Sequence, residues 1–135
     1  LGNVDAQRDW SDAEDFVDGV WKMLNQDGPK DYVLSSNETH SIREFVEEAF
    51  NFAGFHRNAC FWMGKGEKEK YFHGDVCIVE INPIFYRPAE VDILLGDSTN
   101  AREDLKWNPK TDFLGLVRKM VDTDLQTDTL SGGKV

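Results

Sequence analysis

The chain has 135 residues, of which 40% are hydrophobic and 30% charged, and its formal net charge is −10. This composition is typical of one soluble globular domain, which buries about 68% of the surface of its unfolded chain. The acidic balance argues against nucleic-acid binding, which rests on many Lys and Arg contacts to phosphate. No stretch approaches the ~20 consecutive apolar residues of a membrane span, so no membrane association is expected.

The first part of the chain predicts the end of a strand and then a helix. Residues 1–3 are interpreted as the tail of a strand. The helix, expected over residues 11–26, begins at a capping box of Ser11 and Glu14 and ends before Gly28-Pro29. Its apolar residues recur every three or four positions, which predicts one buried face: Ala13, Phe16, Val17, Val20, Trp21 and Leu24.

The middle of the chain predicts a strand, a helix and then two further strands. Residues 31–36 (DYVLSS) form the first strand candidate. A second capping box, Ser41 with Glu44, begins a helix that Gly54 is expected to end. Short strands are expected at residues 60–63 and 76–81, separated by a polar loop. The predicted buried face of this helix consists of Ile42, Phe45, Val46, Ala49 and Phe50.

The last third of the chain predicts two helices. One spans residues 98–105 with Asp97 or Ser98 as its cap, and the other begins at Thr111 or Asp112. The second is expected to bury Phe113, Leu116, Val117, Met120 and Val121. Residues 126–135 lack apolar periodicity and are expected to be a disordered tail, which leaves residues 1–125 as one domain.

These elements define a mixed α/β fold class, in which helices are separated by a few short strands. Three or four short strands are too few to cover so many apolar helix faces. We therefore expect the helices to pack also on a neighbouring domain that this chain does not contain.

The cysteines and histidines give little indication of a metal site or of secretion. The two cysteines, Cys60 and Cys77, are fewer than a small secreted domain usually carries, which predicts a cytoplasmic location. Together with His56 and His73 they match no zinc spacing, so no metal is expected.

Arg8 is the first candidate for ligand binding. It stands in Arg8-Asp9-Trp10, just ahead of the first helix, where free N–H groups at the helix N-terminus favour an anion. The alternative interpretation is a surface ion pair between Arg8 and Asp9 or Asp12.

Arg87 and Glu90 are the second candidates. Pro88 stiffens the loop that carries both, because it fixes its own φ and restricts Arg87 to an extended backbone. An arginine can grip phosphate oxygens in a fork, and a carboxylate can accept hydrogen bonds from sugar hydroxyls. The alternative is an ion pair between Arg87 and Glu90 within the loop.

Three sequence runs carry a resemblance to a known family. They are LGN-x4-RDW at residues 1–10, ETHSIREFV at residues 38–46 and FYRPAEVD at residues 85–92. Together they resemble the GDP-mannose 4,6-dehydratases, and the likeness continues in order to about Leu125. The R-P-x-E run is shared by many extended short-chain dehydrogenases, whereas the combination of the first two runs points to the dehydratases themselves.

The resemblance implies an enzyme of two domains, in which an N-terminal Rossmann domain holds NADP and a smaller C-terminal domain holds the GDP-sugar. The reaction it implies oxidises C4 of GDP-mannose, eliminates water across C5 and C6, and returns the hydride to C6. The product, GDP-4-keto-6-deoxymannose, is a precursor of GDP-fucose. This chain is expected to be the C-terminal substrate-binding part, with the Rossmann half mostly missing, and the whole enzyme is expected to be a homo-oligomer.

The resemblance also assigns roles to the candidate residues. Arg8 and Arg87 correspond to arginines that hold the diphosphate, and Glu90 to the carboxylate that binds the ribose hydroxyls. The family usually has Gly-His after Arg-Asp-Trp, where this chain has Ser11 and Asp12, and the charge of Asp12 could weaken GDP binding.

The sequence contains neither G-x-G-x-x-G nor Tyr-x-x-x-Lys, so no catalytic residue is assigned and the chain alone is expected to be inactive. Two alternatives stay open: a fragment of another nucleotide-sugar epimerase or reductase, and a binding domain without catalysis.

Overall fold

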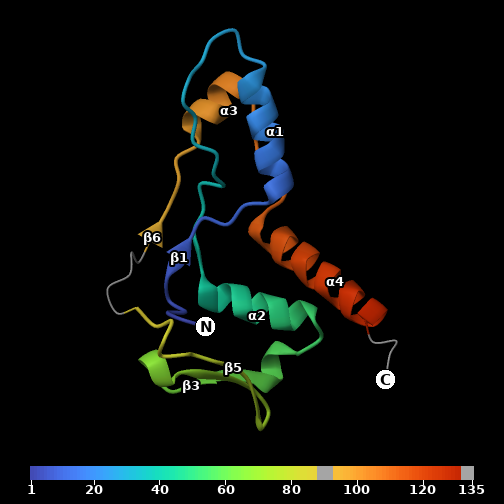
Figure 1. Ribbon diagram of the computed structural model, residues 1–135. Coiled ribbons are helices and arrows are strands. Elements are labelled where there is room, and N and C mark those ends of the chain that lie inside the picture. Colours follow the sequence, from blue (N-terminus) through green and yellow to red (C-terminus); the bar gives the residue numbers. More distant parts are fainter. Residues whose placement is uncertain (88–92, 132–135) are drawn as a thin grey trace. The chain divides into compact units, whose positions relative to one another are not determined.

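The computed structural model describes residues 1–87 and 93–131 (Figure 1). The chain forms two compact units, and it passes from one to the other three times before α4. Unit 1 consists of residues 1–6, 41–92 and 117–135, and unit 2 of residues 7–40 and 93–116.

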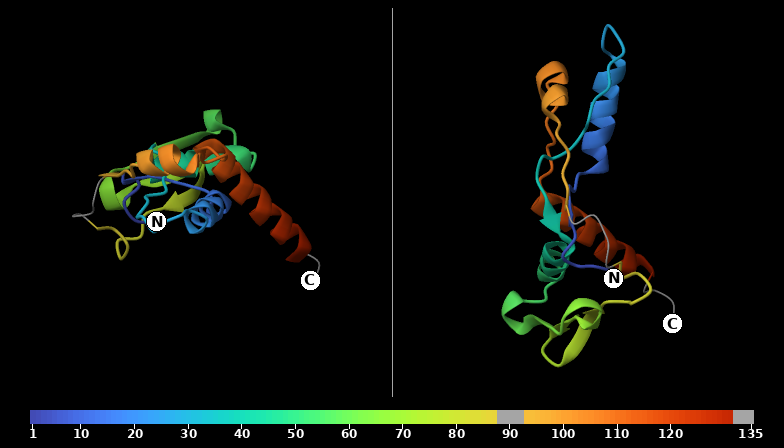
Figure 2. Two further views of the ribbon diagram at one scale, coloured as in Figure 1. Left: turned by 90° about the horizontal axis from the view of Figure 1, so that it is seen from above. Right: turned by 90° about the vertical axis from the view of Figure 1, so that its left-hand side faces the viewer.

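Unit 2 is built around a small sheet and two helices. Strand β1 (Gln7–Arg8) pairs in parallel with β6 (Ile93–Leu94), and β2 (His40–Ser41) is the other neighbour of β1. Helices α1 (Ala13–Leu24) and α3 (Thr99–Leu105) lie side by side in Figure 1 and in both views of Figure 2. The sheet brings segments more than 80 residues apart in the sequence next to each other.

The core of unit 2 is centred on Trp107. This side chain is fully buried and packs with Ala101 and Leu105 of α3, and half-buried apolar residues of the preceding segments cover the cluster. Trp107 Nε1 donates a hydrogen bond of 2.8 Å to the carbonyl oxygen of Asp15. The Asp15 carboxylate accepts from the Thr111 amide at 3.0 Å, so one residue of α1 fixes both ends of the 107–111 segment.

Helix α1 differs from the prediction in its boundaries, its cap and its orientation. The N-cap is Asp12, whose side chain accepts from the Glu14 amide at 3.0 Å, so the expected capping box of Ser11 and Glu14 is wrong. The predicted buried face is also wrong, because every residue of that face is exposed. The residues of α1 that are buried are Asp15 and Gly19. A Cβ atom on Gly19 would lie only 2.6 Å from Leu34 Cδ1, so the helix approaches its neighbour closely on that side.

No strand forms at residues 31–36, where one was expected, and residues 1–3 are likewise not part of a strand. A strand requires a ladder of backbone pairs, and within the described residues no ladder is assigned to either segment. Leu1 nevertheless donates to the Glu80 carbonyl at 3.1 Å and accepts from the Asn82 amide at 2.8 Å. Tyr32 and Leu34 nevertheless pack against the Trp107 cluster, whereas Val33 between them is exposed. The side chains of this segment therefore alternate between inward and outward directions as in a strand, although no partner strand is assigned to it.

Unit 1 contains an antiparallel sheet and helix α2 (Ile42–Phe52). The strands are β3 (Cys60–Met63), β4 (Lys70–His73) and β5 (Val76–Glu80), in the order β3-β4-β5. β3 and β5 confirm the predicted strands, and β4 begins at the end of the expected polar loop. Cross-strand aromatic pairs stabilise the sheet, for instance Trp62 with Tyr71 at 4.6 Å between ring centroids.

Helix α2 begins as predicted. Ser41 and Glu44 form the complete capping box, and Gly54, with φ of 98°, follows the C-cap Ala53. Arg43 ties the helix to its surroundings, because its guanidinium pairs with Glu69 at 2.6 Å and with Asp5 at 2.8 Å. The hydrogen bond with Glu69 holds the pKa of Arg43 above its ordinary value.

The two remaining helices agree with the prediction in part. Helix α3 has Ser98 as its N-cap, which was one of the two expected residues. Helix α4 (Phe113–Ser131) is longer than expected and includes residues 126–131, which were expected to be disordered. Phe113, Leu116 and Val117 are buried as predicted, whereas Met120 is exposed. Residues 132–135 lie outside the described residues.

Candidate functional site

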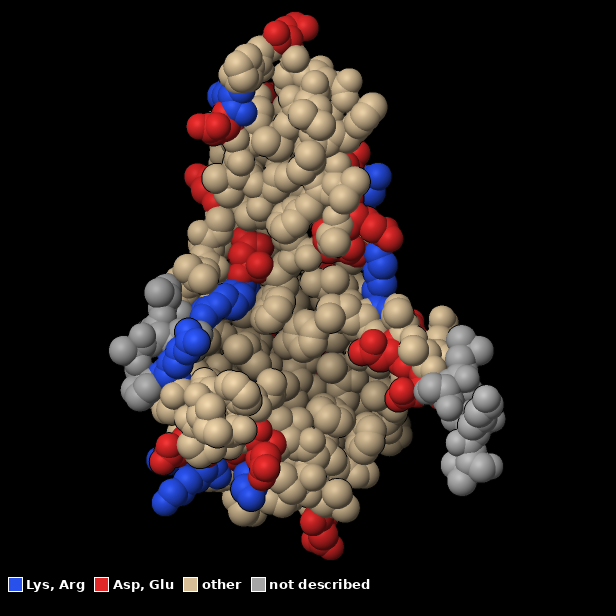
Figure 3. Space-filling model, viewed as in Figure 1, with Lys and Arg blue, Asp and Glu red and all other residues tan. Residues whose placement is uncertain are grey.

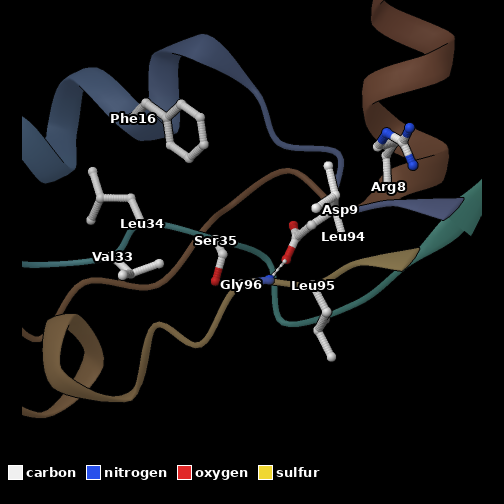
Figure 4. A pocket seen from close by; sticks show the side chains of 9 residues that line it. All are labelled: Arg8, Asp9, Phe16, Val33, Leu34, Ser35, Leu94, Leu95 and Gly96. Atoms are coloured by element: carbon white, nitrogen blue, oxygen red, sulfur yellow. Dashed lines mark hydrogen bonds between the residues drawn. The ribbon is translucent and has the colours of Figure 1, made fainter. Parts of the chain in front are cut away.

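A cleft of about 300 Å³ lies in unit 2 at the point where both parallel strands end (Figure 4). It is lined by residues at the carboxyl ends of β1 and β6, by Phe16 of α1, and by the extended segment before the Ser36 turn. Ligands of open α/β sheets bind in this type of position, outside the carboxyl ends of parallel strands. The lining residues are Arg8, Asp9, Phe16, Val33, Leu34, Ser35, Leu94, Leu95 and Gly96.

Arg8 is the basic residue of this cleft. It is the last residue of β1, its side chain is half-buried, and its Nη1 donates to the carbonyl oxygen of Gln7 at 2.8 Å. Arg8 therefore lies at a cleft beside the end of the sheet, and not at the helix N-terminus where the sequence suggested an anion site. The N-terminus of α1, which the sequence suggested as an anion site, is occupied by the Asp12 carboxylate.

Asp9 organises the polar end of the cleft. Its Oδ1 accepts from the amide and the hydroxyl of Ser36, at 2.8 and 2.6 Å. Its Oδ2 accepts from the amides of Asn37 and Gly96, at 3.2 and 3.3 Å. One carboxylate therefore joins the end of β1 to the turn at residues 36–37 and to the segment after β6, as Figure 4 shows for Gly96.

A second layer of hydrogen bonds supports this arrangement. Asn37, which has a left-handed backbone with φ of 66°, accepts at Oδ1 from Ser35 Oγ and from the amide and hydroxyl of Ser98, all at 2.9 Å. Arg102 donates to Ser98 Oγ at 2.9 Å and to the Ser36 carbonyl at 3.1 Å. These bonds connect α3 to the turn that Asp9 holds.

Sequence reasoning missed the role of Asp9, which it considered only as an ion-pair partner of Arg8. The hydrogen-bond partners of Asp9 lie 27 to 87 residues away along the chain, so no local pattern shows them. Two features of the sequence near these partners nevertheless indicate a tight, hydrogen-bonded turn. One is the Ser-Ser-Asn run at residues 35–37, which is typical of side-chain-bonded turns, and the other is Gly96, where a Cβ would lie 2.4 Å from Ser35 Cβ.

Arg87 lies in unit 1 at a separate cleft of about 260 Å³, together with Gly2, Asn3, Ile42, Ile84 and Phe85. Its side chain is exposed. A Cβ on Gly2 would lie 2.4 Å from the carbonyl oxygen of Phe85, so the chain start and the Arg87 loop approach closely. Glu90, the third predicted binding residue, lies outside the described residues. Arg8 and Arg87 belong to different units.

The described residues form neither a metal site nor a membrane-spanning helix. No group of three or more His, Cys, Asp and Glu side chains among residues 1–87 and 93–131 is placed to hold a metal ion. Within the same ranges, none of the helices has the length and apolarity needed to cross a membrane.

Two solved structures show the fold of this chain. The chain superposes on the structure of RMD from Pseudomonas aeruginosa complexed with NADPH, with a TM-score of 0.65, 18% identity, and coverage of 90% of this chain and 34% of that one. For UDP-glucose 4-epimerase from Thermotoga maritima with UDP-glucose, the TM-score is 0.68, the identity 15%, and the coverage 94% and 34%. The mixed α/β fold is confirmed, and this chain covers about a third of each of these two structures.

Sequence relatives define the family. Residues 1–120 match the family model described as GDP-mannose 4,6 dehydratase. GDP-mannose 4,6-dehydratases of Drosophila melanogaster, Homo sapiens and Sinorhizobium fredii are 44%, 43% and 45% identical to this chain over 93% of its length. The chain therefore belongs to the GDP-mannose 4,6-dehydratase family. It spans 32%, 34% and 35% of the length of these three relatives.

Proposed function

We propose that this chain is the GDP-sugar-binding part of an NADP-dependent GDP-mannose 4,6-dehydratase, a lyase. The observation that carries the proposal is the cleft at the carboxyl ends of β1 and β6, in a chain of this family, with Arg8 at its edge. A guanidinium there can neutralise and orient a diphosphate, because it forms charge-assisted hydrogen bonds in a fixed fork. The substrate that we propose is GDP-mannose, the one named in the relatives.

Arg87 is the second residue that we propose for the diphosphate, and Glu90 the residue for the ribose hydroxyls. Arg87 is exposed at its own cleft, so its donors are accessible to a ligand. Pro88, next in the sequence, restricts the backbone of Arg87 and thereby limits the directions in which its side chain can point.

The chemical step belongs to the rest of the enzyme. This chain contains neither the glycine-rich turn G-x-G-x-x-G nor a Tyr-x-x-x-Lys pair, so its residues do not fit NADP and none receives a catalytic role. We propose that the part of the enzyme outside these 135 residues holds NADP, and that the chain alone binds substrate without turning it over. We further propose a cytoplasmic enzyme that forms homo-oligomers, with residues 1–125 as its substrate-binding domain.

Calorimetry with GDP-mannose tests this proposal. Replacing Arg8 or Arg87 by Ala should each weaken binding by ~1.5–3 kcal/mol, or roughly 10- to 150-fold, the range for a hydrogen bond to a charged group. Lys65→Ala is the matched control, because Lys65 is an exposed cation in the loop before β4. If both arginine variants bind as tightly as the wild-type chain, the assigned roles are wrong.

A second candidate is a different nucleotide-sugar enzyme, since the fold is shared with a UDP-glucose 4-epimerase at a TM-score of 0.68. The product decides between the two. A dehydratase converts GDP-mannose into a 4-keto sugar that has lost water, whereas an epimerase returns an isomer of unchanged mass. Mass spectrometry of the product formed by the enzyme containing this chain therefore separates them.

A further inference from the structure

A further cavity lies in unit 1, where helix α2 faces strands β3 and β4. Its volume is about 160 Å³, and its lining combines a thiol, a phenol, a guanidinium and a carboxylate with two further aromatic rings. None of the residues that line it belongs to the cleft of Arg8 or to that of Arg87. The lining residues are Glu47, Arg57, Cys60, Phe61, Trp62 and Tyr71.

Tyr71 brings a buried hydroxyl to the thiol of Cys60. Tyr71 is only 3% exposed, its ring packs on that of Trp62 with the centroids 4.6 Å apart, and its hydroxyl is hydrogen-bonded to the Cys60 side chain. Burial, and then this hydrogen bond, hold the pKa of Tyr71 above its ordinary value of 10.0. The phenol therefore stays protonated and donates to the sulfur.

His73 lies on the other side of the same thiol. Cys60 of β3 and His73 of β4 are directly paired, so their side chains leave the sheet on one face with Cβ atoms about 4.5–5.5 Å apart. Phe55 contacts both residues. Its ring meets the His73 ring edge-on at 5.1 Å, and its carbonyl oxygen lies 3.9 Å from Cys60 Sγ. An imidazole beside a thiol can accept its proton, and reactive cysteines are found next to such bases and next to arginines.

The charged groups around the cavity are paired with one another. Trp62 Nε1 donates to Glu47 Oε1 at 2.9 Å, and the Arg43 guanidinium lies over the Trp62 ring at 4.6 Å from its centroid. Arg57 pairs with Glu48. In Figure 3, basic and acidic side chains lie next to each other over this sheet, at the lower left. Because the surroundings have no single sign of charge, the size of a ligand decides whether it enters.

We propose that Cys60 is a modification site for small disulfides, and that this cavity receives the transferred group. The Cys60 thiol gives its proton to His73, the thiolate attacks one sulfur of a disulfide R–S–S–R, and a Cys60–S–S–R bond forms as the original S–S bond breaks. The other half leaves as R–S⁻ and takes up the proton as R–SH. The disulfide is thus reduced while Cys60 is oxidised. The site is independent of the proposed function, because it uses no residue of either substrate cleft.

Cys77 provides a comparison within the same sheet. It is exposed, whereas Cys60 is half-buried. Its partner across β4 and β5 is Phe72, which is itself paired with Phe61, so Cys77 lies on the opposite face of the sheet from Cys60. Exposure alone predicts that Cys77 reacts faster, whereas the proposed site predicts that Cys60 does.

The test follows disulfide exchange at both cysteines of the 135-residue chain by mass spectrometry of tryptic peptides. With hydroxyethyl disulfide, a small neutral reagent, we expect Cys60 to react at least fivefold faster than Cys77. With glutathione disulfide, which is too large for the cavity, this preference should disappear. In urea the two cysteines should react at similar rates, because the arrangement around Cys60 is then lost.

Two variants test the residues around the thiol. Tyr71→Phe keeps the buried ring and removes the hydroxyl, and it should slow the reaction of Cys60 at least threefold while leaving that of Cys77 unchanged. His73→Gln should have the same effect. Tyr32→Phe is the matched control, because it removes a hydroxyl of unit 2 that bonds elsewhere. Partial unfolding of a variant would expose the thiol and speed the reaction of Cys60, so it cannot imitate the expected decrease.

Three results would overturn the proposal. One is that Cys60 reacts with hydroxyethyl disulfide no faster than Cys77. Another is that Tyr71→Phe and His73→Gln leave the rate at Cys60 unchanged. The third is that glutathione disulfide prefers Cys60 as strongly as the small reagent does, which would mean that the reaction takes place outside the cavity.

Discussion

Asp9→Asn is the substitution that tests most directly how the cleft is built. In the wild-type chain the carboxylate accepts four hydrogen bonds, two at Oδ1 from Ser36 and two at Oδ2 from the amides of Asn37 and Gly96. Asparagine has nearly the same shape, but it replaces one acceptor oxygen by an NH2 group. If the remaining oxygen stays with Ser36, the NH2 group faces two N–H donors, which lose their acceptor.

The expected loss of unfolding free energy follows from these two lost hydrogen bonds. Leaving one partly buried donor unsatisfied costs about 1–3 kcal/mol. The two bonds at Oδ2 are long, 3.2 and 3.3 Å, and Asn37 is exposed, so each belongs at the low end of that range. We therefore expect Asp9→Asn to lower the free energy of unfolding by ~2 kcal/mol and to weaken GDP-mannose binding, because the wall of the cleft depends on the same carboxylate.

Urea unfolding followed by tryptophan fluorescence measures the stability change. Asp18→Asn is the matched control, because Asp18 pairs with Lys22 at 3.0 Å on the surface of α1. Surface pairs of this kind contribute about 0.3–0.5 kcal/mol. If Asp9→Asn costs no more than Asp18→Asn, the four hydrogen bonds do not hold the cleft together.

Two further changes test the core and the start of α3. Trp107→Phe keeps most of the buried ring but leaves the Asp15 carbonyl without its donor, so it should cost ~1–3 kcal/mol, against ~3–5 kcal/mol for Trp107→Ala, as measured by thermal unfolding. A Trp107→Phe variant as stable as the wild-type chain would show that the hydrogen bond is unimportant. Hydrogen bonds from the hydroxyl and amide of Thr99 lower the pKa of Asp97 below its ordinary value of 3.8. The stability from this group is therefore complete above the ordinary pKa and lost as the pH falls through the lowered one, and a carboxyl NMR titration midpoint at or above 3.8 would contradict it.

Elements that depend on neighbouring residues were predictable from the sequence. The capping box of Ser41 and Glu44 joins residues three apart, and it begins α2 as expected. Strands β3 and β5 follow from short runs of apolar and β-branched or aromatic residues between turns. In each case the determining interactions lie within a few residues or within one small antiparallel sheet.

Features that depend on distant partners were not predictable in the same way. Apolar periodicity grouped the apolar residues of α1 on one side of the helix, but the prediction that this side is buried was wrong, because Asp15 and Gly19 pack inward instead. Residues 31–36 failed as a strand for the same reason, because a strand requires a neighbour. The expectation that the helices pack also on a neighbouring domain stays a prediction.

Asp12 shows how a departure from the family pattern can be accommodated. The sequence raised the concern that its charge, where the family usually has histidine, would oppose a diphosphate. In the structure the Asp12 side chain is buried and its Oδ1 accepts from the Glu14 amide at 3.0 Å, so the charge is directed at the positive end of the α1 dipole. Among the described residues, those that line the Arg8 cleft do not include Asp12. The Asp12 carboxylate therefore stabilises the start of helix α1 and does not line the cleft at which Arg8 lies.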